Sequence, residues 1–313
     1  MNPEYLALPP ARRRWYGPIF LLTVFLLEIM LWQRLERQRS FCQTTGVRFA
    51  SPIATDVLDQ VETFTTSDKN TQGIYASFWG QQDVTISTSN GRHADAVVGI
   101  GYYGSAEDCL PVPYQQGCSP GIYGNECALS EALAQTLFGS TEIVGMKVLA
   151  QKKTYTITGV FSAKESVFLF PTQENLTCAE LRGVSWDAPK EDVETWCAAA
   201  GLKSPQCIVY GPQRVWIMTL FCGFPLFVVG VAFFVTAIRW SCLWPKGIGT
   251  VFWFVLAVLA ALMLPNILDS LPGWLIPGRW SNFAFWQDLA QSIHEQQQAW
   301  KLCAHYWPDL IRR

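Results

Sequence analysis

The stretch LSEALAQTLFG, residues 129–139, decides the fold of the central part of this chain. Ser130 is a typical helix N-cap, because its hydroxyl can accept a hydrogen bond from a free N–H of the first turn. Gly139 stands just after the last apolar residue, where helices commonly end in a left-handed conformation. Leu133 and Leu137 are four residues apart and therefore share one face. The stretch predicts a short helix that packs this face on a sheet.

Strand patterns stand on both sides of this helix. Residues 83–88 alternate between polar and apolar, Asn90-Gly91 is a hairpin signal, and residues 94–100 predict the returning strand. After the helix, residues 146–150 and 155–161 predict two further strands, joined by a polar link. The order strand, strand, helix, strand, strand is typical of a compact α+β domain.

Three motifs in this region resemble a known family. LSEALAQTLFG (129–139), IVGMKV (143–148) and YTITGVF (155–161) are similar, in order and spacing, to the periplasmic core domain of MacB-like ABC transporter permeases. The resemblance covers about residues 97–171. It implies an extracytoplasmic α+β domain inserted between the first and second transmembrane helices of an FtsX-like permease. Such permeases have four spans, pair with an ATPase and work as dimers, and ATP turnover on one side of the membrane moves the domains on the other.

The apolar stretches of the chain agree with that placement. A helix needs about 20 mostly apolar residues to cross a bilayer. We expect transmembrane helices at residues 15–33 (an uncleaved signal-anchor), 215–238 and 248–268. Basic residues at 12–14, 239 and 246 favour the cytoplasm. The chain is therefore expected to be a multi-pass protein of the cell (plasma) membrane, with a cytoplasmic N-terminus (1–14), an extracytoplasmic domain (34–213), a short cytoplasmic link (239–247) and an extracytoplasmic tail (269–313).

Two features differ from the family pattern. No fourth hydrophobic stretch follows Leu268, and the link 239–247 is too short for the coupling helix that the family carries between its second and third spans. Pro245 and Gly247 favour a turn at this link. Direct coupling to an ATPase is therefore an open question. The candidates for cytoplasmic contacts in the link are Arg239, Trp244 and Lys246.

Cysteine is abundant, with ten residues in the chain. An even number in the segments expected outside the cytoplasm suits disulfides, although 105 connectivities are open for eight cysteines, and free or partly buried thiols are the alternative. No pair has the short spacing of a zinc site and the histidines lie in no ligand motif, so no metal is expected. The candidate disulfide cysteines are Cys42, Cys109, Cys118, Cys127, Cys178, Cys197, Cys207 and Cys303.

Glu28 is the candidate polar site inside the expected first span. An ionisable residue within a span is expensive and is a functional candidate by default. Glu28 lies one turn from Trp32, near the expected outer interface. This position favours a structural or interfacial role over a proton or ion role.

The tail has an amphipathic pattern. Apolar residues at steps of three and four predict one helix, with polar residues on its other faces. Such a helix can lie on the outer leaflet, or it can dock on the outer domain or a partner helix. The apolar positions are Trp286, Leu289, Ile293, Trp300, Cys303, Trp307 and Leu310.

Catalytic patterns are weak in this chain. Residues 99–104 (GIGYYG) fit G-x-G-x-x-G, but a dinucleotide site needs a helix at that point, and here we expect the end of a strand followed by a loop. The three histidines are not accompanied by a nucleophile elbow. A net charge of −2 does not favour nucleic acid as a partner. We therefore expect no enzyme, no catalytic residue and no cofactor.

The expected function is that of a non-enzymatic, permease-like membrane subunit of an ABC-type export or envelope-associated complex. Its outer domain would bind a substrate or partner and transmit conformational change. The expected partners are the lipid bilayer, an ABC ATPase and another permease chain, in a homodimer or heterodimer. The alternative is a stand-alone, membrane-anchored extracytoplasmic binding or sensor protein without ATPase coupling.

Overall fold

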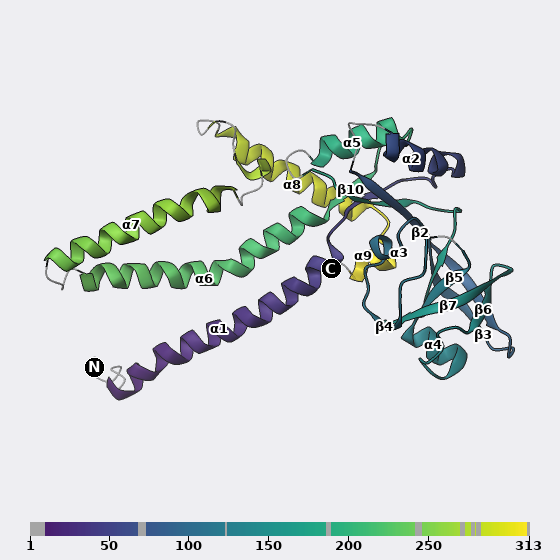
Figure 1. Ribbon diagram of the computed structural model, residues 1–313, viewed down its shortest axis with the longest axis horizontal. Helices are drawn as coiled ribbons and strands as arrows, with labels where there is room; N and C mark the ends of the chain where they lie inside the picture. The colour runs from purple at the N-terminus through teal and green to yellow at the C-terminus, as the bar shows by residue number, and fades with distance from the viewer. Residues whose placement is uncertain are drawn as a thin grey trace, which may run out of the picture. The chain divides into compact units, whose positions relative to one another are not determined.

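The computed structural model describes residues 10–67, 73–122, 124–185, 189–241, 246–269, 273–276, 279 and 283–311. The chain divides into two compact units, drawn with their elements in Figure 1. The helical unit comprises Met1–Arg39 and Gln213–Pro272. The sheet unit comprises Ser40–Pro212 and Gly273–Arg313, so the tail of the chain belongs with the sheet.

The helical unit consists of long helices. These are α1 (Pro10–Phe41), α6 (Gly211–Ser241) and α7 (Lys246–Asp269). Helix α1 runs past the expected span because residues 34–39 are mostly good helix formers. Among the described residues, one helix, over Gly211–Thr236, is long and apolar enough to cross a membrane, and Gly249–Val258 is a shorter apolar run. The three-span arrangement therefore stays a prediction.

The sheet unit is an α+β domain. Its strands lie in the order β10-β1-β9-β2-β3-β8-β5-β7-β4, and β6 pairs with both β2 and β7. The strands are β1 (Thr45–Arg48), β2 (Tyr75–Thr88), β3 (His93–Tyr103), β4 (Tyr114–Gly117), β5 (Glu126–Ser130), β6 (Lys147–Ala150), β7 (Lys153–Phe161), β8 (Val167–Pro171), β9 (Cys178–Arg182) and β10 (Cys207–Tyr210). The helices are α2 (Thr55–Ser67), α3 (Ala106–Cys109), α4 (Glu131–Phe138), α5 (Pro189–Ala199), the 3₁₀ turn η2 (Gly273–Leu275), α8 (Ala284–Leu302) and α9 (Trp307–Ile311).

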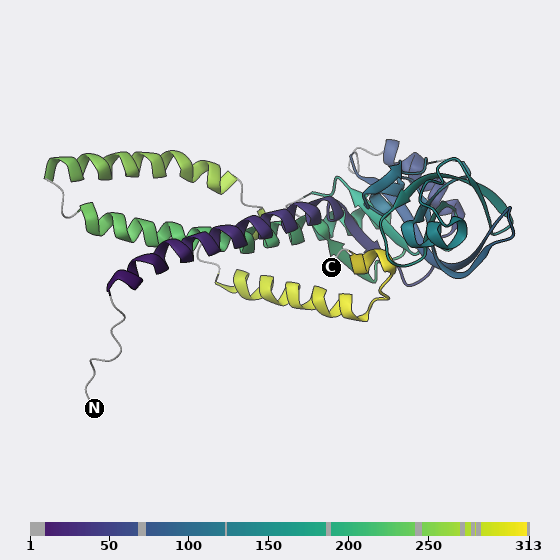
Figure 2. The ribbon, with the colours of Figure 1, turned by 90° about the horizontal axis from the view of Figure 1, so that it is seen from below.

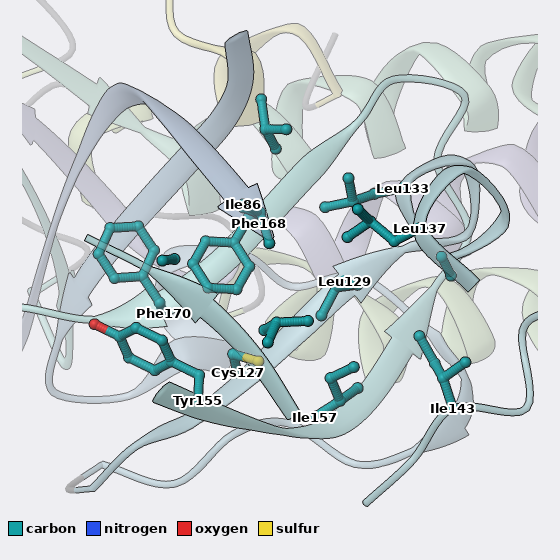
Figure 3. Packing of buried hydrophobic residues seen from close by; sticks show 14 of the residues in the cluster. Ile86, Cys127, Leu129, Leu133, Leu137, Ile143, Tyr155, Ile157, Phe168 and Phe170 are labelled. Carbon is teal, nitrogen blue, oxygen red and sulfur yellow. The ribbon is translucent and has the colours of Figure 1, made fainter. Parts of the chain in front are cut away.

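Part of this sheet closes into a ring. Because β6 joins β2 to β7, the strands β2, β3, β8, β5, β7 and β6 form a closed circuit. Its interior is filled by apolar side chains, and Leu133 and Leu137 of α4 complete this core (Figure 3). In Figure 2 the ring is seen end on, and α4 is drawn in teal across its opening. Tyr155 meets Phe168 edge to face, with ring centroids 5.7 Å apart.

The local predictions for this region are confirmed. Helix α4 begins after Ser130, whose hydroxyl accepts a hydrogen bond from Leu133 N–H at 3.3 Å, and ends at Gly139 with φ of 73°. Strands β2 and β3 form the expected hairpin, with Ser87 opposite His93. The strands expected around residues 146–150 and 155–161 are β6 and β7, which pair in antiparallel fashion.

The sheet extends beyond the ring through β9, β1 and β10, and each face of this extension has its own core. On one face, α2 and α5 cover an apolar cluster that includes Phe78 and Trp196. On the opposite face, a second cluster includes Trp79, Phe161 and Cys178. Trp307 of α9 belongs to this latter cluster, so the end of the chain completes the core of the domain.

The amphipathic pattern of the tail forms two helices rather than the single helix predicted. Helix α8 ends at Leu302, and the chain is extended at Cys303 before α9 begins at Trp307. Pro308 explains the break, because a proline inside a helix clashes with the carbonyl four residues earlier but is well tolerated in a first turn. Helix α8 packs against β10, the strand at one end of the sheet. This contact corresponds to the alternative in which the tail docks on the domain.

Candidate functional site

Three segments that continue the long helices meet in one part of the sheet unit. Strand β1 follows α1 closely in sequence, and β10 directly precedes α6. These two strands are antiparallel neighbours, with Thr45 opposite Tyr210 and Arg48 opposite Cys207. The C-terminal segment, defined here as residues 303–311, follows α7 and α8 and contacts β1 through Asp309. Strand β1 after α1, strand β10 before α6 and the C-terminal segment are therefore connected within the sheet unit.

A buried charge cluster, formed by Arg48, Glu180 and Asp309, makes this connection. The Nη2 atom of Arg48 lies 2.7 Å from Asp309 Oδ1 and 3.1 Å from Glu180 Oε1. All three side chains are almost completely buried, with Glu180 fully so. Because buried charges are costly unless they are paired, removing one member would leave the others in an unfavourable environment. The cluster therefore ties β1, β9 and the C-terminal segment to one another.

Neighbouring groups satisfy the carboxylate of Glu180. Trp79 Nε1–H donates to Oε1 at 3.0 Å, and the Thr44 hydroxyl donates to Oε2 at 2.7 Å. Both oxygens accept hydrogen bonds, which is the pattern expected of an ionised carboxylate. The Arg48 guanidinium also lies over the Trp79 ring, 4.9 Å from its centroid, in a cation–π contact. Gly46 leaves room for this arrangement, since a Cβ there would stand 2.9 Å from Arg48 Nη1.

The electrostatics of Arg48 follow from this geometry. Burial alone would lower the pKa of the guanidinium, because the charged form loses hydration. The negative charges of Glu180 and Asp309 act in the opposite direction, and the pKa is raised well above its ordinary value. Arg48 is therefore a permanent cation at the centre of the cluster.

Aromatic contacts reinforce the position of the C-terminal segment. Trp307 N–H donates to Gln81 Oε1 at 2.7 Å, and its indole N–H donates to Glu165 Oε2 at 3.3 Å. The ring of Tyr306 meets Trp79 edge to face at 5.7 Å between centroids. The segment is thus held by ionic, polar and aromatic contacts over a few residues.

A groove with a volume of about 570 Å³ lies between α5, β10 and α8. Its wall is apolar at Leu202 and Ile208, and carboxylates from Glu194 and Glu295 also line it. The groove follows the edge strand β10, where α8 supplies one side. It is a concave surface of the size that small ligands use.

The predicted disulfide cysteines are dispersed in the sheet unit. No disulfide joins any of the nine cysteines in the described part of the chain. Cys127 lies in the core of the ring, Cys197 lies on α5 in the cluster with Phe78 and Trp196, and Cys109 and Cys178 lie in the cluster with Trp79. A set of four disulfides is therefore not observed, and the pairing of these cysteines stays a prediction.

Glu28 lies on α1 with its side chain buried. Its Oε1 atom accepts a hydrogen bond from Trp32 Nε1–H at 3.2 Å, in agreement with the one-turn spacing. Among the described residues, its other oxygen has no hydrogen-bond partner. In the same unit, the Cys222 thiol of α6 approaches the Leu31 carbonyl at 4.0 Å. A functional role for Glu28 stays a prediction.

The remaining candidates lie in the link and in the glycine motif. Arg239 lies in α6 and Lys246 begins α7, whereas Trp244 lies outside the described residues. The motif at 99–104 runs along β3, as expected. The prediction of a loop after the motif is partly wrong, because Ser105 caps the four-residue helix α3. Such a short helix after the motif does not fit a dinucleotide site.

Sequence reasoning did not identify Arg48, Glu180 or Asp309. Each is a single charged residue in a short segment, and single charged residues are normally solvated. Their partners are distant in sequence, since Arg48 and Asp309 are 261 positions apart. Pro308 was the one available signal, because it marks the start of a separate short helix next to Asp309.

Comparisons with known proteins concern the fold of the domain. No family model matches the chain, and no curated protein matches it. Among solved structures, it is similar to the extracellular domain of the noncanonic ABC-type transporter YknZ from Gram-positive bacteria, with 16% identity and a TM-score of 0.39 over 50% of this chain and 96% of that chain. It is also similar to the periplasmic region of MacB from Actinobacillus actinomycetemcomitans, with 12% identity and a TM-score of 0.43 over 56% and 92% of the two chains. The MacB region is the type of domain that the three sequence motifs resemble.

Proposed function

We propose that this chain is a permease-like, non-enzymatic membrane subunit that transmits conformational change between its helices and its extracytoplasmic domain. The observation that carries the proposal is the pairing of β1 with β10, with Asp309 bound to Arg48 on the same strand. A shift of α1 or α6 along its axis would act directly on adjacent strands of one sheet. The buried cluster would pass the same shift to the C-terminal segment.

The motifs at 129–161 support a place in an ABC-type export or envelope-associated complex. In that setting the partners are an ABC ATPase and a second permease chain, and the domain presents the groove between α5 and α8 to a substrate or partner. The rival function is a stand-alone extracytoplasmic binding or sensor protein. The short link after α6 favours this rival, because it offers little surface to an ATPase.

Purification of the tagged, full-length chain from membranes tests the proposal. We expect a protein with a nucleotide-binding motif to co-purify in stoichiometric amount, together with ATP hydrolysis. Limited proteolysis of the complex should then differ between ATP-bound and ADP-bound states at the C-terminal segment. Recovery of the chain alone, without ATPase activity, would reject the transporter subunit in favour of the sensor.

A further inference from the structure

Cys207 and Cys303 occupy neighbouring positions at the edge of the sheet. Cys207 is the first residue of β10, and its direct cross-strand partner is Arg48. Cys303 directly follows α8, the helix that packs against β10. The two cysteines come from separate parts of the chain, and both adjoin the contact between α8 and β10.

The charge cluster brings the chain around Cys303 to this place. Asp309 binds Arg48 at 2.7 Å, and Arg48 is the cross-strand partner of Cys207. Both cysteine side chains are buried, with 4% and 6% of their surfaces exposed. The Cys303 thiol contributes to raising the pKa of the Cys207 thiol, which places the two side chains near one another. Cys207 and Cys303 are therefore neighbours at the contact between β10 and α8.

We propose that Cys207 and Cys303 form a disulfide in the mature protein, which fixes the C-terminal segment to the edge strand of the domain. The inference rests on the extracytoplasmic placement of the domain, because disulfides persist in oxidising compartments. The two thiols give up two protons and two electrons as the S–S bond forms. The oxidant is the disulfide of a thiol oxidoreductase, which exchanges through a mixed disulfide and leaves as a dithiol.

The other buried cysteines are separated from this pair. Cys178 lies opposite Arg48 on β9, so Arg48 stands between it and Cys207. Cys127 and Cys197 lie in two other cores. Cys118 is exposed and serves as a control for access of reagents. Cys178, Cys127 and Cys197 are therefore placed apart from the contact between β10 and α8.

Burial determines when the bond can form. Burial raises the pKa of the Cys207 thiol to about 12, so the reactive thiolate is scarce in the folded domain. Oxidation is accordingly expected while α8 and the C-terminal segment are still docking. Once formed, the disulfide is shielded from reductants because both cysteines are buried.

Mass spectrometry of the full-length protein from membranes provides the test. The protein is denatured in acid, alkylated without reductant and digested. We expect the peptides containing Cys207 and Cys303 to be recovered as one linked species. In Cys207→Ser or Cys303→Ser the remaining cysteine should be alkylated, whereas the control Cys178→Ser should retain the link. Recovery of both peptides in alkylated, unlinked form would overturn the inference.

Labelling of Cys118 separates this failure from a failure of the topology. A membrane-impermeant maleimide on intact cells should label the wild type and not Cys118→Ser. Labelling of Cys118 together with unlinked Cys207 and Cys303 would refute the disulfide and leave the placement standing. Labelling only after permeabilisation would refute the placement itself.

Discussion

At the scale of single residues, Arg48 is expected to contribute strongly to the stability of the domain, because it pairs with Glu180 and Asp309 in a buried cluster. Its guanidinium pairs with two buried carboxylates, and breaking a buried ion pair typically costs about 3–5 kcal/mol. We expect Arg48→Met to lower the free energy of unfolding by an amount in this range. Chemical unfolding of the purified full-length protein, followed by tryptophan fluorescence, would measure it.

A second ion pair provides the matched control. Arg182 binds Asp108, but 52% of the Arg182 side chain is exposed. Solvent-screened pairs contribute about 0–1 kcal/mol, so Arg182→Met should cost little. Equal losses in the two variants would contradict the special role of the charge cluster.

Cys178 gives a prediction about pH. Burial raises the pKa of its thiol from 9.0 to about 12. The folded state therefore retains a proton that the unfolded state releases, and stability is present below pH 9 and is lost as the pH rises toward 12. One such proton corresponds to about 1.4 kcal/mol per pH unit. The fall in unfolding free energy between pH 9 and 11 should be smaller in Cys178→Ala than in wild type, and unchanged in the exposed-site control Cys118→Ser.

At the scale of secondary structure elements, α4 depends on Ser130. Its buried hydroxyl accepts from Leu133 N–H in the helix and from Val167 N–H at 2.9 Å in β8. Removal of a cap costs about 0.5–2 kcal/mol, and here a buried strand N–H is orphaned as well. Ser130→Ala should therefore lie near the upper end of this range in an unfolding experiment. The exposed Thr136→Ala in the same helix should change stability by less than about 0.5 kcal/mol.

The same elements explain what the sequence could predict. Ser130, Gly139 and Asn90-Gly91 act on their immediate neighbours, so α4 and the β2–β3 hairpin followed from local signals. Strands β1 and β10 have four residues each, and most of the domain's sequence lies between them. No local pattern encodes a pairing over such a separation. The charge cluster was missed for the same reason. The break at Cys303 was predictable from Pro308, but the apolar periodicity continued through it.

At the scale of the whole molecule, the C-terminal segment is required for a complete core. Truncation after Leu302 removes Trp307 from the cluster with Trp79 and removes Asp309, one of the two carboxylate partners of Arg48. Loss of one large buried aromatic side chain alone costs about 3–5 kcal/mol. We expect the truncated protein to be digested faster by a protease than wild type, within the sheet unit.

A substitution at an exposed site distinguishes this effect from a nonspecific increase in sensitivity to the protease. Leu302 is 81% exposed, so Leu302→Ala should leave the rate of digestion unchanged. A truncated protein as resistant as wild type would show that the segment adds nothing to the domain.

The contact between Arg48 and Asp309 also has a consequence for biosynthesis. These residues are 261 positions apart, so Arg48 is synthesised long before the Asp309 carboxylate that pairs with it. Domains generally fold as units during synthesis, but this one must wait. In the meantime Glu180 and Trp79 lack their covering segment, and a nascent chain in this state is a natural substrate for chaperones and quality-control proteases.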